Sequence, residues 1–353
     1  EAPVVLVQDY HFALAPRLIR DRLPESTVIA FWHIPWPALR DLQTCLWRQE
    51  LLEGLLASDV VGFHTEADCR AFLDAVSRLL DARVDRRRGR VQYEGRETTV
   101  RAYPISVEWP NRLAQQSPPI DECRTKVARR LHLTKPVRLI VGVDRLDYTK
   151  GICEKMLAFE RLLETCPEFQ RQVTLVQIAE PSRERLPAYR ALRARLLSTI
   201  DRINRRFGAD GYQPIVLRHE HHEPAEVYEF LRAADVCYVG SLHDGMNLVA
   251  KEFVAARDDG RGVLVLSSRA GAARQLDTAL LVDPYAIDDS ALMLERALRM
   301  PADEQAARMA AMRAAVAEFN SFWWAGRMLQ DAAAGRRPKP VPPRAVVQAW
   351  PLG

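Results

Sequence analysis

Asp244 and Glu252 lie in the segment HDGMNLVAKE with seven residues between them. The apolar run 236–239 just before this segment predicts a buried strand, and Gly245 predicts a turn into a helix. The amides of 245–248 would then form an exposed helix N-terminus, which attracts phosphates. Glu252 would lie two helical turns further on, roughly 12 Å along the axis, so the two carboxylates could not share a proton. They could hold two ends of one elongated, phosphorylated ligand.

A second cluster, DRLDYTKG, places Arg145 and Lys150 five residues apart after another apolar run. A guanidinium fork and a compact ammonium together suit a diphosphate. They could equally form ion pairs with the neighbouring acids Asp144, Asp147 and Glu154. From the sequence alone the two interpretations are even.

Polar side chains also follow other predicted strands. Arg183 could bind a second anion or form a surface ion pair. Asp9, His11 and His33 end two neighbouring predicted strands, where they could bind sugar hydroxyls, polarise a leaving group or, less favourably, bind a metal. The histidine-rich stretch 219–223 lacks the spacing of a zinc motif.

Short β-branched runs alternate with longer amphipathic segments, which predicts a doubly wound α/β architecture with parallel sheets. Strands are expected at 4–7, 28–31, 60–63, 137–143, 173–178, 215–217, 236–239 and 263–266. The first is expected to be fully buried. A hairpin is expected over 91–103, after an arginine-rich loop at 83–90. Ligands bind beyond the carboxyl ends of strands in such sheets, so the clusters described above lie where chemistry is expected.

A domain boundary is expected between 109 and 135, where prolines and a charged helix separate two sets of strands. We predict a first Rossmann-like domain over 1–118, rejoined by the last helix at 322–334, and a second over 119–321. A Pro-rich tail would follow over 335–353. The chain begins without Met and runs at once into an apolar strand, so the first domain is expected to be incomplete at its N-terminus.

The composition is that of an ordinary globular protein and permits a site for small anionic ligands. With 353 residues, 27% charged residues and a net charge of +4, the chain favours such ligands over nucleic acid. Six cysteines without a CxxC pair indicate a reducing cytoplasm, and no stretch approaches the roughly 18 apolar residues of a membrane span. The chain also lacks GxGxxG, GxxxxGK[ST], GxSxG and DxD motifs. These absences disfavour the enzyme classes that such motifs mark. They leave an enzyme that neutralises a diphosphate with Arg and Lys and needs no metal or cofactor.

Six segments, QDYH, FWHIPWP, DRLDYTKG, QIAEPSR, RINRRFG and LHDGMNLVAKEFVAAR, together resemble the trehalose-6-phosphate synthase family of retaining, GT-B-type glycosyltransferases. The resemblance runs in order from about residue 4 to residue 332. It implies two Rossmann-like domains and transfer of glucose from UDP-glucose to glucose 6-phosphate, giving trehalose 6-phosphate and UDP with retention. The implied partners are these small molecules, with no cofactor, nucleic acid or membrane, and a homo-oligomer is left open.

The resemblance also implies roles on the donor side. Arg145 and Lys150 would hold the diphosphate and stabilise its charge as it leaves. Asp244 would bind hydroxyls of the transferred glucose and Glu252 those of the ribose. Contacts to the sugar and phosphate would come from Gly245, Met246, Asn247, Leu248 and Val249.

On the acceptor side, Asp9 would orient the sugar, Arg183 would bind its 6-phosphate, and His33 would face the leaving bond. The implied catalytic set comprises Asp9, His33, Arg145, Lys150 and Asp244. The family's Gly-containing loop and its other residues for the acceptor phosphate, upstream of the DYH segment, are not found in this sequence. The same pattern is compatible with a glucosylglycerol-phosphate synthase, a pseudo-glycosyltransferase or a nucleotide-sugar-binding module without turnover.

Overall fold

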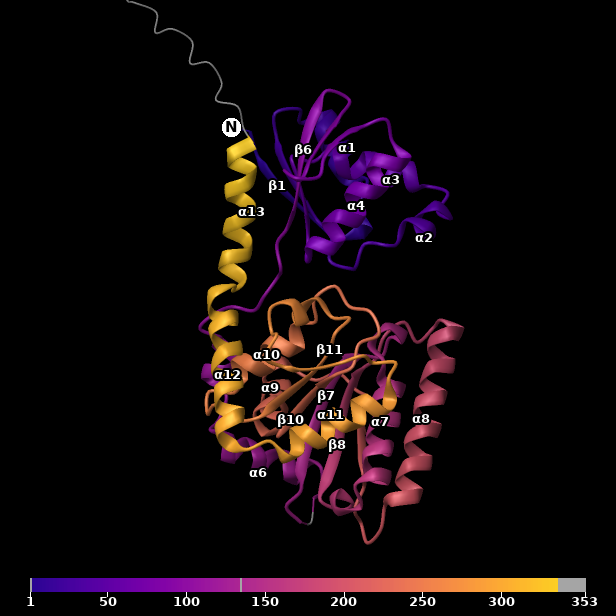
Figure 1. Cartoon of the computed structure of the whole chain (residues 1–353), viewed down its shortest axis with the longest axis vertical. Coiled ribbons are helices and arrows are strands. Elements are labelled where there is room, and N and C mark those ends of the chain that lie inside the picture. The colour runs from indigo at the N-terminus through magenta and orange to yellow at the C-terminus, as the bar shows by residue number, and fades with distance from the viewer. Residues whose placement is uncertain (1, 134, 336–353) are drawn as a thin grey trace, which may run out of the picture.

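The computed structural model describes residues 2–133 and 135–335, which form two lobes, each built around a six-stranded sheet (Figure 1). The first sheet has the order β1-β2-β3-β6-β5-β4 and the second β12-β11-β10-β7-β8-β9. Strands of the first sheet are β1 (Val4–Gln8), β2 (Thr27–Phe31), β3 (Val60–Phe63), β4 (Arg83–Asp85), β5 (Arg90–Tyr93) and β6 (Arg96–Ala102). Those of the second are β7 (Arg138–Arg145), β8 (Val173–Glu180), β9 (Ile215–Arg218), β10 (Val236–Val239), β11 (Val263–Ser267) and β12 (Leu280–Val282).

The second sheet is parallel throughout and doubly wound. Its strands proceed outward from β7 in one direction and from β10 in the other, so β7 and β10 are neighbours at its centre. The crevice between the carboxyl ends of two such strands is the usual ligand position in open α/β sheets. In the first sheet only the β4-β5-β6 part is antiparallel, and the predicted α/β class with two Rossmann-like sheets is confirmed.

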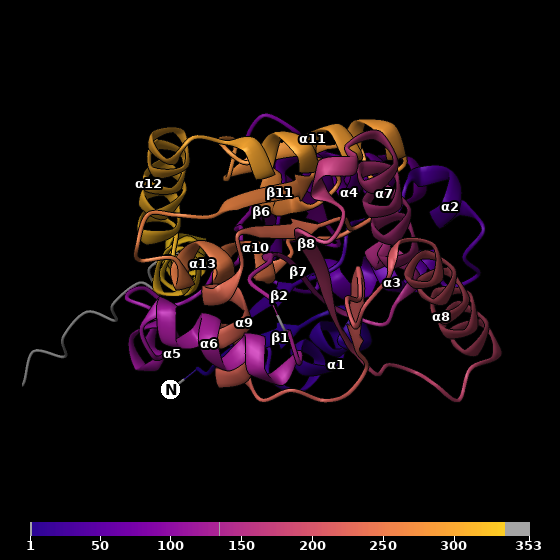
Figure 2. The same cartoon turned by 90° about the horizontal axis from the view of Figure 1, so that it is seen from below.

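Helices cover both faces of each sheet, which explains why the strands are apolar runs and not alternating ones. In the first lobe α1 (Ala15–Arg22), α2 (Leu39–Gln43), α3 (Arg48–Leu56) and α4 (Glu66–Leu79) pack on one face of the sheet, and the last helix, α13 (Ser321–Gly335), packs on the other. In the second lobe, α7 (Ile152–Thr165), α8 (Pro187–Phe207) and α11 (Ile287–Arg299) contribute to one core cluster. The cluster on the opposite face contains α5 (Arg112–Gln116), α6 (Ile120–Arg130), α9 (Pro224–Ala233), α10 (Leu248–Ala256) and α12 (Ala302–Glu318) (Figure 2).

The last helix, α13 (Ser321–Gly335), continues from α12 back to the first lobe (Figure 1). Met328 and Ala332 are 1% and 3% exposed and pack in a cluster with residues of β2 and β3. The Tyr103 hydroxyl donates to the Asp331 carboxylate at 2.9 Å. The chain therefore crosses between the lobes twice, and the Ser321 amide of one crossing donates to the Val107 carbonyl of the other at 2.9 Å.

Three expectations about the strands were wrong. β1 is an edge strand and not a buried one, since Val4 and Leu6 are 50% and 49% exposed. The segment predicted as a loop, 83–90, contains β4, and β12 was not expected. The predicted boundary at 118/119 stays a prediction. Most of the predicted tail, 336–353, lies outside the described residues, and Gly335 still belongs to α13.

All six cysteines lie in described parts of the chain and are free thiols. Cys45 is partly exposed, whereas burial raises the pKa of the other five: Cys69, Cys123, Cys153, Cys166 and Cys237. Among the described residues, no helix combines the length and the apolar character needed to cross a bilayer.

Candidate functional site

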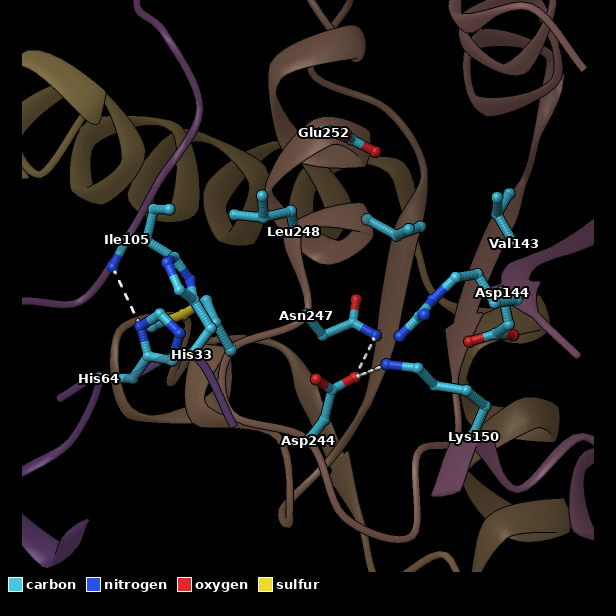
Figure 3. Close-up of a pocket in the computed structure, with 13 residues that line it drawn as sticks. His33, His64, Ile105, Val143, Asp144, Lys150, Asp244, Asn247, Leu248 and Glu252 are labelled. Carbon is cyan, nitrogen blue, oxygen red and sulfur yellow. Dashed lines mark hydrogen bonds and ion pairs between the residues drawn. The ribbon is translucent and has the colours of Figure 1, made fainter. Parts of the chain in front are cut away.

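A pocket of about 290 Å³ opens at the carboxyl ends of β7 and β10, where the first lobe meets the second (Figure 3). It therefore lies at the position that the topology of the second sheet predicts. Its lining residues are His33, His64, Ile105, Val143, Asp144, Arg145, Lys150, Asp244, Met246, Asn247, Leu248, Val249 and Glu252. All the predicted donor-side residues except Gly245 are among them.

Lys150 and Asp244 meet across the pocket, although 94 residues separate them in the chain. The Lys150 Nζ lies 2.6 Å from Oδ2 of Asp244, which also accepts from Ser241 Oγ at 3.1 Å and Asn247 Nδ2 at 3.0 Å (Figure 3). Both side chains are largely buried. The pair brings together the two sequence clusters that we expected to serve one ligand.

Arg145 lies at the end of β7 and is exposed to the pocket. Its side chain has no hydrogen bond or ion pair within residues 2–133 and 135–335. The acids that could have neutralised Arg145 or Lys150 are engaged elsewhere. Asp144 pairs with the fully buried Lys155, Asp147 accepts from Thr149 and Tyr189, and Glu154 lies 3.6 Å from Arg195. Within the described residues no ion pair joins Arg145 or Lys150 to these three acids, so the Arg145 guanidinium is available to an anion.

The helix after Asp244 begins three residues later than predicted. α10 starts at Leu248, and Asn247, at a φ of 71°, caps it by accepting from the Ala250 amide at 3.1 Å. The free helix N-terminus facing the pocket is therefore formed by the amides of Leu248 and Val249, and the amides of 245–247 precede the helix. Gly245 instead lies against the first lobe, where an added Cβ would meet the His33 carbonyl at 2.3 Å.

Glu252 lies one turn into α10, and its carboxylate faces the pocket (Figure 3). Burial raises the pKa of Glu252. In the described part of the chain no donor pairs with this carboxylate. Glu252 is partly buried and lines the pocket, so a ligand hydroxyl that enters the pocket can donate to its carboxylate.

The first lobe contributes two imidazoles. The Nε2 of His33 lies 2.7 Å from Gln8 Oε1, and the His33 amide donates to Asp9 at 3.1 Å. Burial lowers the pKa of His33. His64, for which we expected no role, follows β3 and lies in the same pocket. Its pKa falls to about 3, mainly through burial and then through the nearby His33 and Lys251.

The predicted acceptor residues lie beside the pocket and not in it. Asp9, at a φ of 70°, precedes the short 3-10 helix η1 (Tyr10–Phe12). Arg183, in the exposed segment after β8, reaches the Tyr10 hydroxyl with Nη2 at 3.5 Å and the Tyr189 hydroxyl with Nη1 at 3.2 Å. The structure thus brings Arg183 next to the Asp9 segment, as an acceptor site would require. We assigned no role to either tyrosine: Tyr10 lies in the QDYH segment, of which only Asp9 was given a role in binding the acceptor, and Tyr189 lies in no segment that we singled out.

A buried lysine connects α10 to the segment that links the lobes. Lys251 is 1% exposed, and its Nζ donates to the Ile105 carbonyl at 2.7 Å and to Gln275 Oε1 at 2.6 Å. Burial lowers the pKa of Lys251 to about 7. A lysine in a helical pattern is typical of a surface, so its position could only come from the tertiary structure.

The histidines of 219–223 bond to protein acceptors. His219 contacts the Ala179 carbonyl, His221 contacts Glu180 and His222 contacts the Glu220 carbonyl. Over the described ranges, no group of three or more side chains with metal-ligand atoms is gathered in one place.

The sequence model of glycosyltransferase family 20 matches residues 1–334. The chain is 36% identical over 337 residues to a UDP-forming α,α-trehalose-phosphate synthase of Pichia angusta, covering 94% of this chain and 70% of that protein. A crystal structure of the Burkholderia xenovorans α,α-trehalose-phosphate synthase in complex with glucose-6-phosphate is 37% identical with a TM-score of 0.86, covering 94% of this chain and 74% of that one. A structure from E. coli bound with UDP-2-fluoro glucose is 35% identical with a TM-score of 0.88, covering 94% and 73%.

Proposed function

The chain belongs to glycosyltransferase family 20, and we propose that it transfers glucose from UDP-glucose to glucose 6-phosphate, forming trehalose 6-phosphate and UDP with retention. One observation carries the proposal. A single pocket at the switch point of the second sheet brings together Arg145, the Lys150–Asp244 pair and Glu252, and the side chains of Arg145 and Glu252 have no hydrogen-bond partner in the part of the chain that the structure describes. Two cations and two separated acids are what a nucleotide sugar requires.

On the donor side, Arg145 and Lys150 bind the diphosphate. The free guanidinium of Arg145 offers two parallel N–H donors, and the Lys150 ammonium adds a point charge. As the bond to glucose breaks, negative charge grows on the leaving diphosphate, and these fixed cations stabilise it without reorganising. The free amides of Leu248 and Val249 donate to the same ligand, and Glu252 accepts from the ribose hydroxyls.

Asp244 positions the transferred sugar and is not a nucleophile. Its Oδ2 accepts from Lys150, Ser241 and Asn247, which stabilise the carboxylate and reduce its tendency to attack carbon. No described residue donates to its Oδ1, which is available to sugar hydroxyls. With no other nucleophile assigned, the acceptor hydroxyl attacks on the face that the diphosphate leaves, and the leaving phosphate oxygen takes its proton.

On the acceptor side, Asp9 orients the sugar and Arg183 binds its phosphate, while His33 faces the reacting bond. The support is their shared location, since the Asp9 carboxylate contacts the His33 amide and Arg183 contacts Tyr10. The likeness to a relative solved in complex with glucose-6-phosphate supports a phosphorylated sugar as the acceptor.

Incubation with UDP-glucose and either glucose 6-phosphate or glycerol 3-phosphate tests the proposal. We expect UDP release with glucose 6-phosphate, and NMR of the product should show an α,α-linked disaccharide phosphate. UDP release only with glycerol 3-phosphate would contradict the proposed acceptor. Binding of UDP in a calorimeter without turnover on either acceptor would leave a nucleotide-sugar-binding module instead.

A further inference from the structure

Arg183 is held by two tyrosine hydroxyls that come from different lobes. Tyr189 belongs to α8 and is 4% exposed, whereas Tyr10 belongs to η1, directly after β1. Both hydroxyls accept from the guanidinium, at 3.2 Å and 3.5 Å. A guanidinium has five N–H donors, so these two bonds leave three for a ligand.

Asp147 fixes the direction of the Tyr189 bond. The Tyr189 hydroxyl donates to Oδ2 of Asp147 at 2.9 Å, and Oδ1 accepts from the amide and the hydroxyl of Thr149, both at 3.0 Å. Because a carboxylate can only accept, the Tyr189 proton points to Asp147 and the oxygen lone pairs face Arg183. Burial alone would raise the pKa of Asp147, but the bonds from Thr149 and Tyr189 outweigh it and the pKa is lowered. The chain of hydrogen bonds therefore ends on a stable charge.

Asp147 lies in the loop that also carries Arg145 and Lys150, and it precedes the 3-10 helix η2 (Tyr148–Lys150). Its carbonyl accepts from the Lys150 amide at 3.1 Å. Through Tyr189, the loop that contributes the cations of the pocket is thus joined to the arginine outside it. Neither α8 nor Tyr189 lines the pocket itself.

Arg183 needs such an anchor. It is exposed, and its φ of 47° places it in a region that side chains other than glycine rarely adopt. A long side chain on such a segment loses rotamer freedom when it binds an anion, and fixing it beforehand reduces that cost.

We propose that Tyr189 is a positioning residue that orients Arg183 toward the phosphate of the acceptor and couples it to the donor-binding loop. The inference rests on the proposed function in one respect, namely that the acceptor carries a phosphate. Tyr189 contacts no reacting atom and acts through Arg183.

The variant Tyr189→Phe tests this, because it removes only the hydroxyl. In calorimetry with UDP present, the dissociation constant of glucose 6-phosphate should rise about ten- to 150-fold, the equivalent of about 1.5–3 kcal/mol for a hydrogen bond to a charged group. The dissociation constant of UDP should stay within twofold. In the assay, KM for glucose 6-phosphate should rise by a similar factor while kcat changes less.

Tyr212→Phe is the matched control. The Tyr212 hydroxyl donates to the Val173 carbonyl at the other end of the second sheet. This variant should lose a similar amount of stability and keep its affinity for glucose 6-phosphate. A second check is the double variant Tyr189→Phe with Asp147→Asn. The factor by which it raises the dissociation constant of glucose 6-phosphate should be clearly smaller than the product of the factors for the two single variants.

Unchanged affinity for glucose 6-phosphate in Tyr189→Phe would overturn the inference, and so would equal weakening of UDP and glucose 6-phosphate. Wild-type protein should also be titrated with glycerol 3-phosphate and inorganic phosphate. If glycerol 3-phosphate or inorganic phosphate bound and glucose 6-phosphate did not, the proposed acceptor would be contradicted. The affinities of wild type and Tyr189→Phe would then be compared for the ligand that binds. Binding of UDP but of none of the three phosphates would overturn the role of Tyr189 as well.

Discussion

Replacing Arg145 tests the pocket most directly. Its side chain has no partner among the described residues, so its removal breaks no hydrogen bond or ion pair within the protein. We expect Arg145→Ala to lower kcat/KM by about 10²–10³, the range for loss of one preorganised donor to a developing charge. Arg145→Lys should recover only part of this, since an ammonium cannot form the bidentate contact. Steady-state kinetics and calorimetry with UDP measure both effects.

A matched control is Arg87→Ala, which removes an exposed arginine from the turn between β4 and β5. Activity should be unchanged there. If Arg145→Ala bound UDP and turned over as wild type does, the assigned diphosphate site would be wrong.

His64 makes the stability of the folded chain depend on pH. In the unfolded chain its pKa is about 6.5, and in the folded chain it is about 3. Between these values the unfolded state binds more protons, so the free energy of unfolding must fall as the pH drops from about 6.5 toward 3. The slope is at most about 1.4 kcal/mol per pH unit for one proton. The groups that bear on His64 include His33, Lys251 and Asp244.

Urea unfolding at pH 7, 6, 5 and 4 measures this slope. His64→Gln should lose less stability than wild type over that range. His132→Asn, at an exposed position whose φ of 52° Asn tolerates, should follow the wild-type slope. Parallel curves for wild type and His64→Gln would show that His64 is not the group responsible.

At the scale of the element, Gly151 sets the start of α7 just after Lys150. Its φ is 61°, and an added Cβ would meet the Gly240 carbonyl oxygen at 2.2 Å, so the backbone itself would have to move. Gly151→Ala should therefore lower the free energy of unfolding by about 1–3 kcal/mol and weaken UDP binding through Lys150. Urea unfolding and calorimetry separate the two effects.

Gly326, within α13, gives the opposite expectation. No described atom beyond its own stretch of helix lies within 4 Å of the position that an added Cβ would take, and its backbone is helical. Gly326→Ala should stabilise the protein by about 0.4–1 kcal/mol through helix propensity and the unfolded state. If Gly151→Ala and Gly326→Ala lowered the free energy of unfolding equally, the approach of the Gly240 carbonyl oxygen to position 151 would not be what destabilises Gly151→Ala.

At the scale of the whole molecule, α13 is part of the first lobe although it ends the described chain. Met328 is 1% exposed against that lobe, whereas its neighbour Leu329 is 44% exposed. We expect Met328→Ala to cost about 2–5 kcal/mol and Leu329→Ala much less. Chemical denaturation measures the free energy of unfolding of both variants. Equal decreases in that free energy would show that α13 does not stabilise the first lobe.

Sequence patterns predicted the strands that carry the site, because buried parallel strands are apolar runs bounded by polar residues. They could not show that β1 is an edge strand, since an apolar run looks the same at an edge and at a centre. β4 and β12, of three residues each, are too short for a periodic signal. Residue types and spacing indicated Arg145, Lys150, Asp244 and Glu252 as candidate ligand-binding residues, and their roles stay predictions. The Lys150–Asp244 pair and the burial of Lys251 could not be predicted, because they depend on partners distant in the chain.

The distribution of the thiols has a practical consequence for spectroscopy. Because Cys45 is the only cysteine of the chain that is not buried, a maleimide dye should attach there first, between α2 and α3 of the first lobe. A second dye at an introduced cysteine on the exposed surface of α8, for example Arg190→Cys, would place the pair on opposite lobes. Energy transfer between the two dyes would then report any change in the distance between the lobes when UDP or a sugar phosphate is added.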